Sequence, residues 1–166
     1  RDLPCALNYN MSRFTLKEED GPAAMMQTAF GQGNTVATPY HMALITSAIA
    51  NGGVVMQPQF ISKIESADGR TVRENRSSEY RRIMTDSEAM VMQDLMKEVI
   101  ATGTATELSG LEYTVAGKTG SAEYYMADGQ IGAHSWFVGY SNVDDPNIVV
   151  VVLAENGGAG RQTAVP

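Results

Sequence analysis

Three strand-forming segments follow one another in the last third of the sequence and are separated only by short turns. They run from Tyr113 to about Tyr124, from His134 to Tyr140 and from Ile148 to Ala154, and they are rich in β-branched and aromatic residues. Ala127-Asp128-Gly129 and Asp144-Asp145-Pro146 are typical turn sequences that fit between them. Connections this short join antiparallel neighbours. The pattern therefore predicts an antiparallel meander in which the first segment is an outer strand.

The third segment, Ile148 to Ala154, is apolar at every position, which is typical of a strand buried on both faces. We therefore expect it in the middle of a sheet with helices on both sides. The whole chain, residues 1–166, fits one globular domain of the α/β class, α+β type, with an antiparallel meander covered by helices.

Two helices that could cover this sheet carry clear start signals. Thr38 is a favourable N-cap, Pro39 suits the first helical position, and Asn51-Gly52-Gly53 ends the helix that begins there. Thr85-Asp86-Ser87-Glu88 is a capping box that opens a long amphipathic helix, and Thr104-Ala105-Thr106-Glu107 is a second box that predicts a short helix. The apolar stripe expected on the long helix consists of Met92, Leu95, Met96, Val99 and Ile100.

Between the first two helices the sequence predicts a small β-ribbon outside the main sheet. Short strands are expected at Val54 to Gln57, at Phe60 to Glu65 and at Thr71 to Arg73, with a turn at Ala67-Asp68-Gly69-Arg70 before the last one. A group of arginines follows, and a solvated face is favoured over contact with an anionic polymer. The group consists of Arg73, Arg76, Arg81 and Arg82.

The 166 residues carry a formal net charge of -7, which argues against binding to nucleic acid or to an anionic membrane surface. The longest apolar run is far too short to span a bilayer and no charged-then-apolar leader opens the sequence, so we expect no membrane segment in this chain. The single cysteine, Cys5, permits no intrachain disulfide, and no signature around it supports a thiol nucleophile.

A short polar motif, Lys118-Thr119-Gly120-Ser121, lies on the predicted outer strand. Lys118 would supply a point charge, and the hydroxyls of Thr119 and Ser121 would hold a carboxylate. Gly120 would let a ligand approach the backbone closely. These groups are the ones needed to hold a peptide by its C-terminal end, although a Lys-Thr-Gly triplet alone is a weak signal.

Further stretches, taken together with Lys-Thr-Gly, resemble one protein family. The sequence from about Ala24 to Pro166 is similar to the C-terminal half of the transpeptidase domain of penicillin-binding proteins, and most similar to the class B type. The resemblance implies a partial penicillin-binding transpeptidase or serine β-lactamase-like fold. The stretches that carry it are Ala29-Phe30-Gly31-Gln32-Gly33, Thr38-Pro39-Tyr40-His41-Met42-Ala43, Ala50-Asn51-Gly52-Gly53, Gly103-Thr104-Ala105 and Trp136-Phe137-Val138-Gly139-Tyr140.

The resemblance also implies a reaction. In the family, the serine of a Ser-x-x-Lys motif attacks the carbonyl carbon of a D-Ala-D-Ala peptide bond, releases D-Ala and passes the acyl group to the amine of a neighbouring stem peptide. β-Lactams imitate that peptide and acylate the same serine. The implied partners are therefore peptidoglycan stem peptides and β-lactam antibiotics, and no cofactor or metal is expected.

By the same resemblance, Lys118 and Ser121 are the catalytic candidates. Lys118 would stabilise the substrate carboxylate and take part in proton transfer, and the Ser121 backbone N–H would be one of two donors to the oxyanion. Thr119 would donate a hydrogen bond to the carboxylate. Gly120 would stay small so that the substrate can lie antiparallel to the strand.

Glu123 and His134 are further candidates for substrate contact, since both should fall near the rim of the cleft. Structural roles are the favoured alternative for each of them, because paired polar residues are common near sites.

The sequence departs from the family pattern in lacking two of its three motifs. None of its serines begins Ser-x-x-Lys or Ser-x-Asn, and Tyr140-Ser141-Asn142 follows Lys-Thr-Gly, whereas the second motif of the family precedes it. We therefore expect the chain to be the C-terminal part of one transpeptidase domain, with the missing N-terminal half as its partner and without a nucleophile of its own. Hydrolysis of β-lactams is disfavoured, because no Glu-x-x-Leu-Asn stretch is present.

Two alternatives stay open at this point. The chain could belong to a non-catalytic penicillin-binding-like sensor or scaffold, or to a D-Ala-D-Ala carboxypeptidase. Because peptidoglycan cross-linking is extracytoplasmic, the expected location is the outer face of a bacterial cytoplasmic membrane, with the anchor outside this chain.

Overall fold

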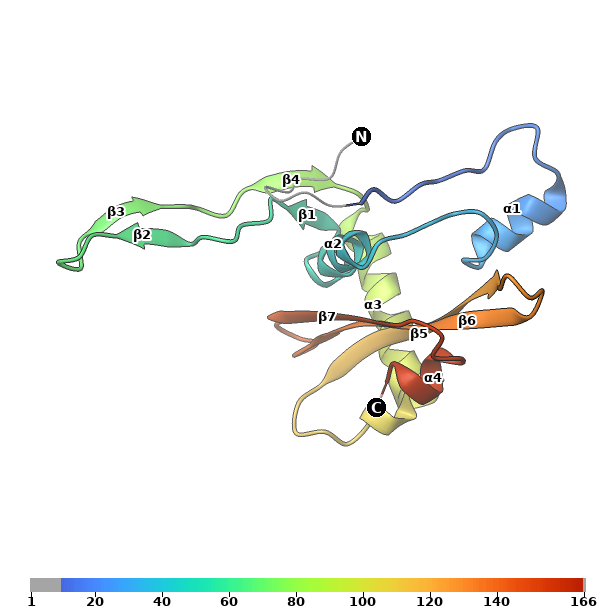
Figure 1. Cartoon of the computed structure of the whole chain (residues 1–166). Coiled ribbons are helices and arrows are strands. Elements are labelled where there is room, and N and C mark those ends of the chain that lie inside the picture. The colour runs from blue at the N-terminus through green and yellow to red at the C-terminus, as the bar shows by residue number, and fades with distance from the viewer. Residues whose placement is uncertain (1–9, 166) are drawn as a thin grey trace.

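The structure, a computed structural model, describes residues 10–165, so Cys5 lies outside the described residues. Its main sheet is three-stranded and antiparallel and consists of β5 (Val115–Tyr125), β6 (Ile131–Ser141) and β7 (Ile148–Ala154), in the order β5-β6-β7 (Figure 1). Each strand pairs with the next one along the chain. The predicted meander is confirmed, and the strand with the Lys-Thr-Gly motif is an outer strand.

Both predicted helix starts are confirmed. α2 (Pro39–Ala50) begins after Thr38, whose hydroxyl accepts a hydrogen bond from a backbone N–H of the first turn. α3 (Asp86–Ala101) begins with a complete capping box, in which the side chains of Thr85 and Glu88 each accept the other residue's backbone N–H. These caps satisfy N–H groups that a helix start otherwise leaves unpaired.

The apolar stripe predicted for α3 is only partly correct. Met96 and Ile100 are buried, as expected, whereas Leu95 is 58% exposed and Met92 is 38% exposed. Ala89 is also buried, at the position seven residues before Met96. The buried face of α3 is therefore narrower than the stripe, and two of the expected core residues point away from it.

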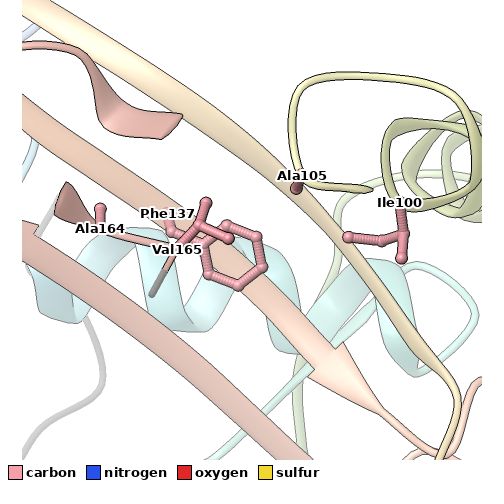
Figure 2. Packing of buried hydrophobic residues seen from close by; sticks show 5 residues of the cluster. All are labelled: Ile100, Ala105, Phe137, Ala164 and Val165. Carbon is pink, nitrogen blue, oxygen red and sulfur yellow. The ribbon is translucent and has the colours of Figure 1, made fainter. Parts of the chain in front are cut away.

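Buried residues lie on both faces of the main sheet. On one face Tyr140 packs against Ile49 of α2 and Met96 of α3. On the other face Phe137 packs against Val165, which follows the short helix α4 (Gly160–Thr163). Figure 2 shows this second cluster, which consists of Ile100, Ala105, Phe137, Ala164 and Val165.

The position predicted for the apolar segment Ile148 to Ala154 is wrong for the part of the chain that the structure describes. β7 is an outer strand there, on the side of β6 opposite β5, and Ile148 and Val150 are 56% and 45% exposed. An apolar run indicates that both faces of a strand can be covered. It does not indicate whether both edges are paired, which depends on segments distant in sequence.

The predicted β-ribbon forms outside the main sheet. β2 (Lys63–Glu65) pairs with β3 (Thr71–Glu74), every residue of both strands is exposed, and the ribbon projects to the left in Figure 1, away from the main sheet. The first predicted strand is β1 (Val54–Met56), but its partner is β4 (Glu79–Arg82). β4 was not predicted as a strand, because its charged sequence lacks the apolar alternation of a half-buried strand, and all four of its residues are exposed.

The second predicted capping box does not form. Residues Thr106–Leu108 make a single 3-10 turn, η1, without a side-chain cap, and the hydroxyl of Thr104 is bonded elsewhere. Two helices were not predicted, α1 (Pro22–Ala29) and α4. Within residues 10–165, no helix is long and apolar enough to cross a membrane.

Candidate active site

The Lys-Thr-Gly motif lies on a strand with one open edge. β5 pairs with β6 from Val115 to Tyr125, and no other strand of residues 10–165 pairs with it. In an antiparallel strand, the N–H and C=O of one residue point to the same side, and successive residues alternate between the two sides. Half of the backbone groups of β5 therefore face its open edge, to which an extended peptide can add as a further strand.

Two side-chain contacts identify which residues face outward. The Gln32 amide donates from Nε2 to the C=O of Ser121 at 2.8 Å, and Lys118 Nζ donates to the C=O of Thr119 at 2.7 Å. Because alternate residues share a direction, Thr119, Ser121 and Glu123 present their backbone N–H and C=O to the open edge. A ligand carbonyl that approaches this edge can accept a hydrogen bond from the Ser121 N–H.

The side chains of the motif lie on both faces of the sheet. Side chains alternate along a strand, so Lys118 shares a face with Tyr140, whereas Thr119 and Ser121 lie on the face of Phe137. Lys118 is exposed and makes no ion pair with any residue between 10 and 165. Its ammonium is therefore available to an anionic ligand.

Thr119 is buried, and its hydroxyl is already engaged. It is 8% exposed, and its Oγ1 lies 2.5 Å from Oγ1 of Thr104, in the loop between α3 and η1. Gly103 lets this loop pass close to α3, because a Cβ there would lie 2.7 Å from Cα of Val99. A hydroxyl has one hydrogen to donate. Thr119 can therefore donate to a ligand carboxylate only while it accepts from Thr104.

The Ser121 hydroxyl points away from the open edge. Its Oγ accepts the backbone N–H of Gly160 at 3.0 Å, so the segment that begins α4 is attached to β5 at this residue. A Cβ at Gly160 would lie only 2.2 Å from the C=O of Gly120. The close approach requires glycine at position 160. Because the Ser121 hydroxyl is bonded to Gly160, only the backbone N–H and C=O of Ser121 face the open edge.

Glu123 and His134 lie on opposite faces, because His134 pairs with Ala122 in the register of β5 and β6. The exposed Glu123 donates its backbone N–H to Oε1 of Gln32 at 3.3 Å. The His134 ring stacks on Tyr124 with ring centroids 4.5 Å apart, and its Nδ1 accepts the N–H of Asn156 at 3.3 Å. These contacts tie His134 to the loop after β7.

A cavity of about 500 Å³ adjoins the far end of β5. Its wall combines amide side chains from α1 and the following loop with residues from β5 and β6. Among the lining residues are Gln27, Phe30, Gln32, Asn34, Glu123 and Tyr125. A peptide whose carboxylate lay at Lys118 and that ran antiparallel to β5 would extend toward this cavity.

Two residues that contact the motif belong to the stretches that carry the family resemblance, but the sequence predicted no role at the site for either of them. They are Thr104, which bonds Thr119, and Gln32, which bonds the backbone of β5. The local signal at Gln32 was its position between Gly31 and Gly33, which have φ of 83° and 84°. A polar side chain between two such glycines is held in a fixed turn, but its partner could not be found from the sequence.

Comparison with known proteins finds relatives in one family. Residues 14–166 match the family described as penicillin binding protein transpeptidase domain. The chain is 29% identical over 157 residues to the peptidoglycan D,D-transpeptidase PbpA of Mycolicibacterium smegmatis, covering 93% of this chain and 31% of that protein. It is 31% identical over 156 residues to the peptidoglycan D,D-transpeptidase MrdA of Acinetobacter baumannii, covering 85% of this chain and 23% of that protein.

Solved structures show the same similarity. The chain matches penicillin-binding protein A from M. tuberculosis, in a ceftriaxone acyl-enzyme complex, with a TM-score of 0.83 and 26% identity, covering 96% of this chain and 36% of that one. It matches penicillin-binding protein 2B from Streptococcus pneumoniae with a TM-score of 0.76 and 26% identity, covering 95% of this chain and 27% of that one. The chain thus spans about a third or less of these relatives.

Proposed function

This chain belongs to the penicillin-binding protein transpeptidase family, and on that premise we propose that it is the substrate-binding part of a peptidoglycan D,D-transpeptidase. The protein that carries it cross-links stem peptides through an acyl-serine intermediate and is acylated by β-lactams. The nucleophilic serine comes from the N-terminal half of the same domain, because no serine of this chain stands in a Ser-x-x-Lys motif.

The observation that carries this proposal is the open edge of β5. It presents the N–H of Ser121 outward beside an exposed Lys118 that lacks an ion-pair partner among residues 10–165. A strand edge binds an extended peptide through its backbone, and a nearby cation favours the end of the peptide that carries a carboxylate.

Each residue of the motif has one role in the proposal. Lys118 stabilises the substrate carboxylate and takes part in proton transfer, and Thr119 donates to the same carboxylate. The Ser121 N–H donates to the oxyanion as charge develops on the carbonyl oxygen, a contact worth about 2.7–4 kcal/mol in comparable acyl-transfer sites. Gly120 keeps the ligand close to the strand. Glu123 and His134 are candidates for substrate contact beyond the motif, with structural roles the favoured alternative for each.

The reaction has two steps. In the first, the serine oxygen bonds to the carbonyl carbon of the terminal D-Ala-D-Ala bond, that C–N bond breaks, and D-Ala leaves with the serine proton on its nitrogen. In the second, the amine of a neighbouring stem peptide attacks the ester carbon, the serine oxygen leaves, and the proton lost by the amine returns to the serine.

The substrate gives the location and the partners. Peptidoglycan stem peptides lie outside the cytoplasmic membrane, so we place the protein on the extracytoplasmic face, with its anchor outside this chain. Two of the relatives are themselves named peptidoglycan D,D-transpeptidases, which favours this activity over a non-catalytic sensor.

Intact-mass spectrometry after incubation with a β-lactam tests the proposal. The full-length protein that carries this sequence is expected to gain the mass of one ring-opened β-lactam, on a serine outside residues 1–166. The 166-residue chain alone serves as the matched control and is expected to gain none. Absence of an adduct on the full-length protein would contradict the proposed function, and an adduct on the short chain would contradict the assignment of the nucleophile.

A further inference from the structure

We propose that Gln32 is a specificity-determining residue that occupies the open edge of β5 when no ligand is bound, and that a ligand amide must displace it to reach Ser121. This inference rests on the proposed function, since it concerns the same ligand-binding edge. It assigns a role to a residue that belongs to neither Lys-Thr-Gly nor the strand that carries it.

Gln32 bonds two backbone groups at the open edge of β5 that an added strand would also bond. Its side-chain amide offers one donor and one acceptor side by side, and both are used. Nε2 donates to the C=O of Ser121 at 2.8 Å, and Oε1 accepts the N–H of Glu123 at 3.3 Å. The two partners are 89 and 91 residues away in sequence. A single side chain thus reproduces part of the hydrogen bonding that a peptide would make to this edge.

A ligand needs the same carbonyl. In an antiparallel pair, two facing residues exchange both of their hydrogen bonds, so a partner that accepts from the Ser121 N–H places its own N–H at the Ser121 C=O. Consider a peptide or β-lactam whose reacting carbonyl oxygen accepts from the Ser121 N–H. The amide N–H of the same ligand residue then points to the Ser121 C=O. This is the atom that Gln32 Nε2 already bonds.

The surroundings of Gln32 allow it to leave without unfolding its loop. The backbone of the loop is fixed by other contacts, since the Gln32 N–H donates to the C=O of Gln27 at 2.8 Å and the flanking Gly31 and Gly33 adopt positive φ. The side chain also lines the cavity of about 500 Å³ beside β5. A glutamine side chain can change rotamer into such a space while its backbone stays in place.

The consequence is a difference between ligand classes. A ligand that directs an amide N–H to the Ser121 C=O must break the hydrogen bond from Gln32 Nε2 to that oxygen. A ligand without such an amide leaves this bond in place. Penicillin G carries an acylamino side chain with such an N–H, and imipenem carries a hydroxyethyl group at the equivalent position. Removal of the Gln32 amide should therefore favour penicillin G over imipenem.

The experiment measures second-order acylation rates of the full-length protein by both antibiotics. In Gln32→Ala, the ratio of the penicillin G rate to the imipenem rate should rise about two- to tenfold, as expected for the loss of one competing hydrogen bond. Gln32→Met should give a rise of similar size, because it retains most of the side-chain length but has no N–H to donate. Gln59→Ala is the matched control: it removes a side-chain amide that donates to the C=O of Arg76, away from β5, and should leave the ratio unchanged.

The outcomes separate the two proposals. If the wild-type protein is acylated and the ratio in both Gln32 variants stays the same or falls, Gln32 is not a competitor of the ligand and the inference is wrong. If neither antibiotic acylates the wild-type protein, the proposed function itself fails. If the Gln32→Ala protein does not fold, the ratio of the two acylation rates in Gln32→Met tests the inference.

Discussion

The hydroxyl groups of Thr104 and Thr119 lie 2.5 Å apart and join the loop after α3 to the motif strand. Thr119 has one hydrogen to donate, so the direction of this bond decides whether Thr119 can donate to a ligand. If Thr119 donates to a ligand carboxylate, as proposed, Thr104 is the donor in this bond. The contact therefore couples the loop after α3 to the proposed role of Thr119.

Replacement of Thr104 by valine tests this contact. Thr104→Val keeps the shape of the side chain but leaves the buried Thr119 hydroxyl without this partner. We expect the free energy of unfolding of the full-length protein to fall by about 1–3 kcal/mol, the cost of a buried polar group that loses its hydrogen bond. Urea unfolding monitors the change, and Thr104→Ser, which retains the hydroxyl, is the control. Equal stability of the valine variant and the wild type would show that the bond does not contribute.

Lys118 offers a prediction about ligand binding without a change in fold. Because its side chain is exposed and makes no ion pair within residues 10–165, Lys118→Met should leave the melting temperature nearly unchanged. Acylation by β-lactams should slow about ten- to a hundredfold, since a hydrogen bond to a charged group contributes about 1.5–3 kcal/mol. Stopped-flow acylation kinetics measure the rate. A rate close to that of the wild type would remove Lys118 from the carboxylate site.

Gly160 gives a prediction about close packing on β5. The added Cβ of Gly160→Ala would lie 2.2 Å from the C=O of Gly120, and a backbone atom cannot move aside as a flexible side chain can. We expect a loss of stability of about 1–3 kcal/mol, typical of overpacking, together with slower acylation because β5 shifts. Gly21→Ala is the control, since no atom lies within 4 Å of its added Cβ. A Gly160→Ala protein with unchanged melting temperature would mean that the α4 segment moves freely away from β5.

Tyr140 gives a prediction about alkaline pH. Burial, with a smaller contribution from the negative charge of Asp94, raises the pKa of Tyr140 from 10.0 to about 12. The folded protein therefore retains this proton at pH values where the unfolded chain has lost it. Stability from this group is fully present below pH 10, and it declines as the pH rises from 10 toward 12.

Tyr140→Phe isolates that contribution. The Tyr140 hydroxyl is buried and has no hydrogen-bond partner within the described residues, so its removal should leave the stability at pH 7 unchanged or raise it by about 1 kcal/mol. Between pH 10 and 12 the variant should lose less stability than the wild type. Chemical unfolding at a series of pH values measures both effects. Parallel stability curves for the two proteins in this range would contradict the assignment.

Local patterns explain which parts of the structure were predictable. The helix starts at Thr38 and Thr85 depend on residues within one turn, and the order of the three main strands depends on short turns. The position of β7 at an edge, the pairing of β1 with β4, and the contacts of Thr104 and Gln32 depend on segments far apart in sequence. Thr104 illustrates the difference, because its hydroxyl could cap a helix nearby or bond Thr119, and only the folded chain decides between them.

The motif strand was identified from residue types, but its side-chain directions were not. Lys118, Thr119 and Ser121 were expected to face one ligand together. In the structure the Ser121 hydroxyl is bonded to Gly160, and Lys118 lies on the opposite face from Thr119. Strand alternation could have indicated this division of the motif between two faces.

The open edge of β5 is also a risk for the protein. An unpaired edge of an 11-residue strand is a template for pairing with the same strand of another copy, which is how many proteins begin to aggregate. Lys118 and Glu123 place charges along this edge, and Gln32 covers part of its backbone. The features of this edge that are proposed to serve a peptide ligand would therefore also protect it from self-association.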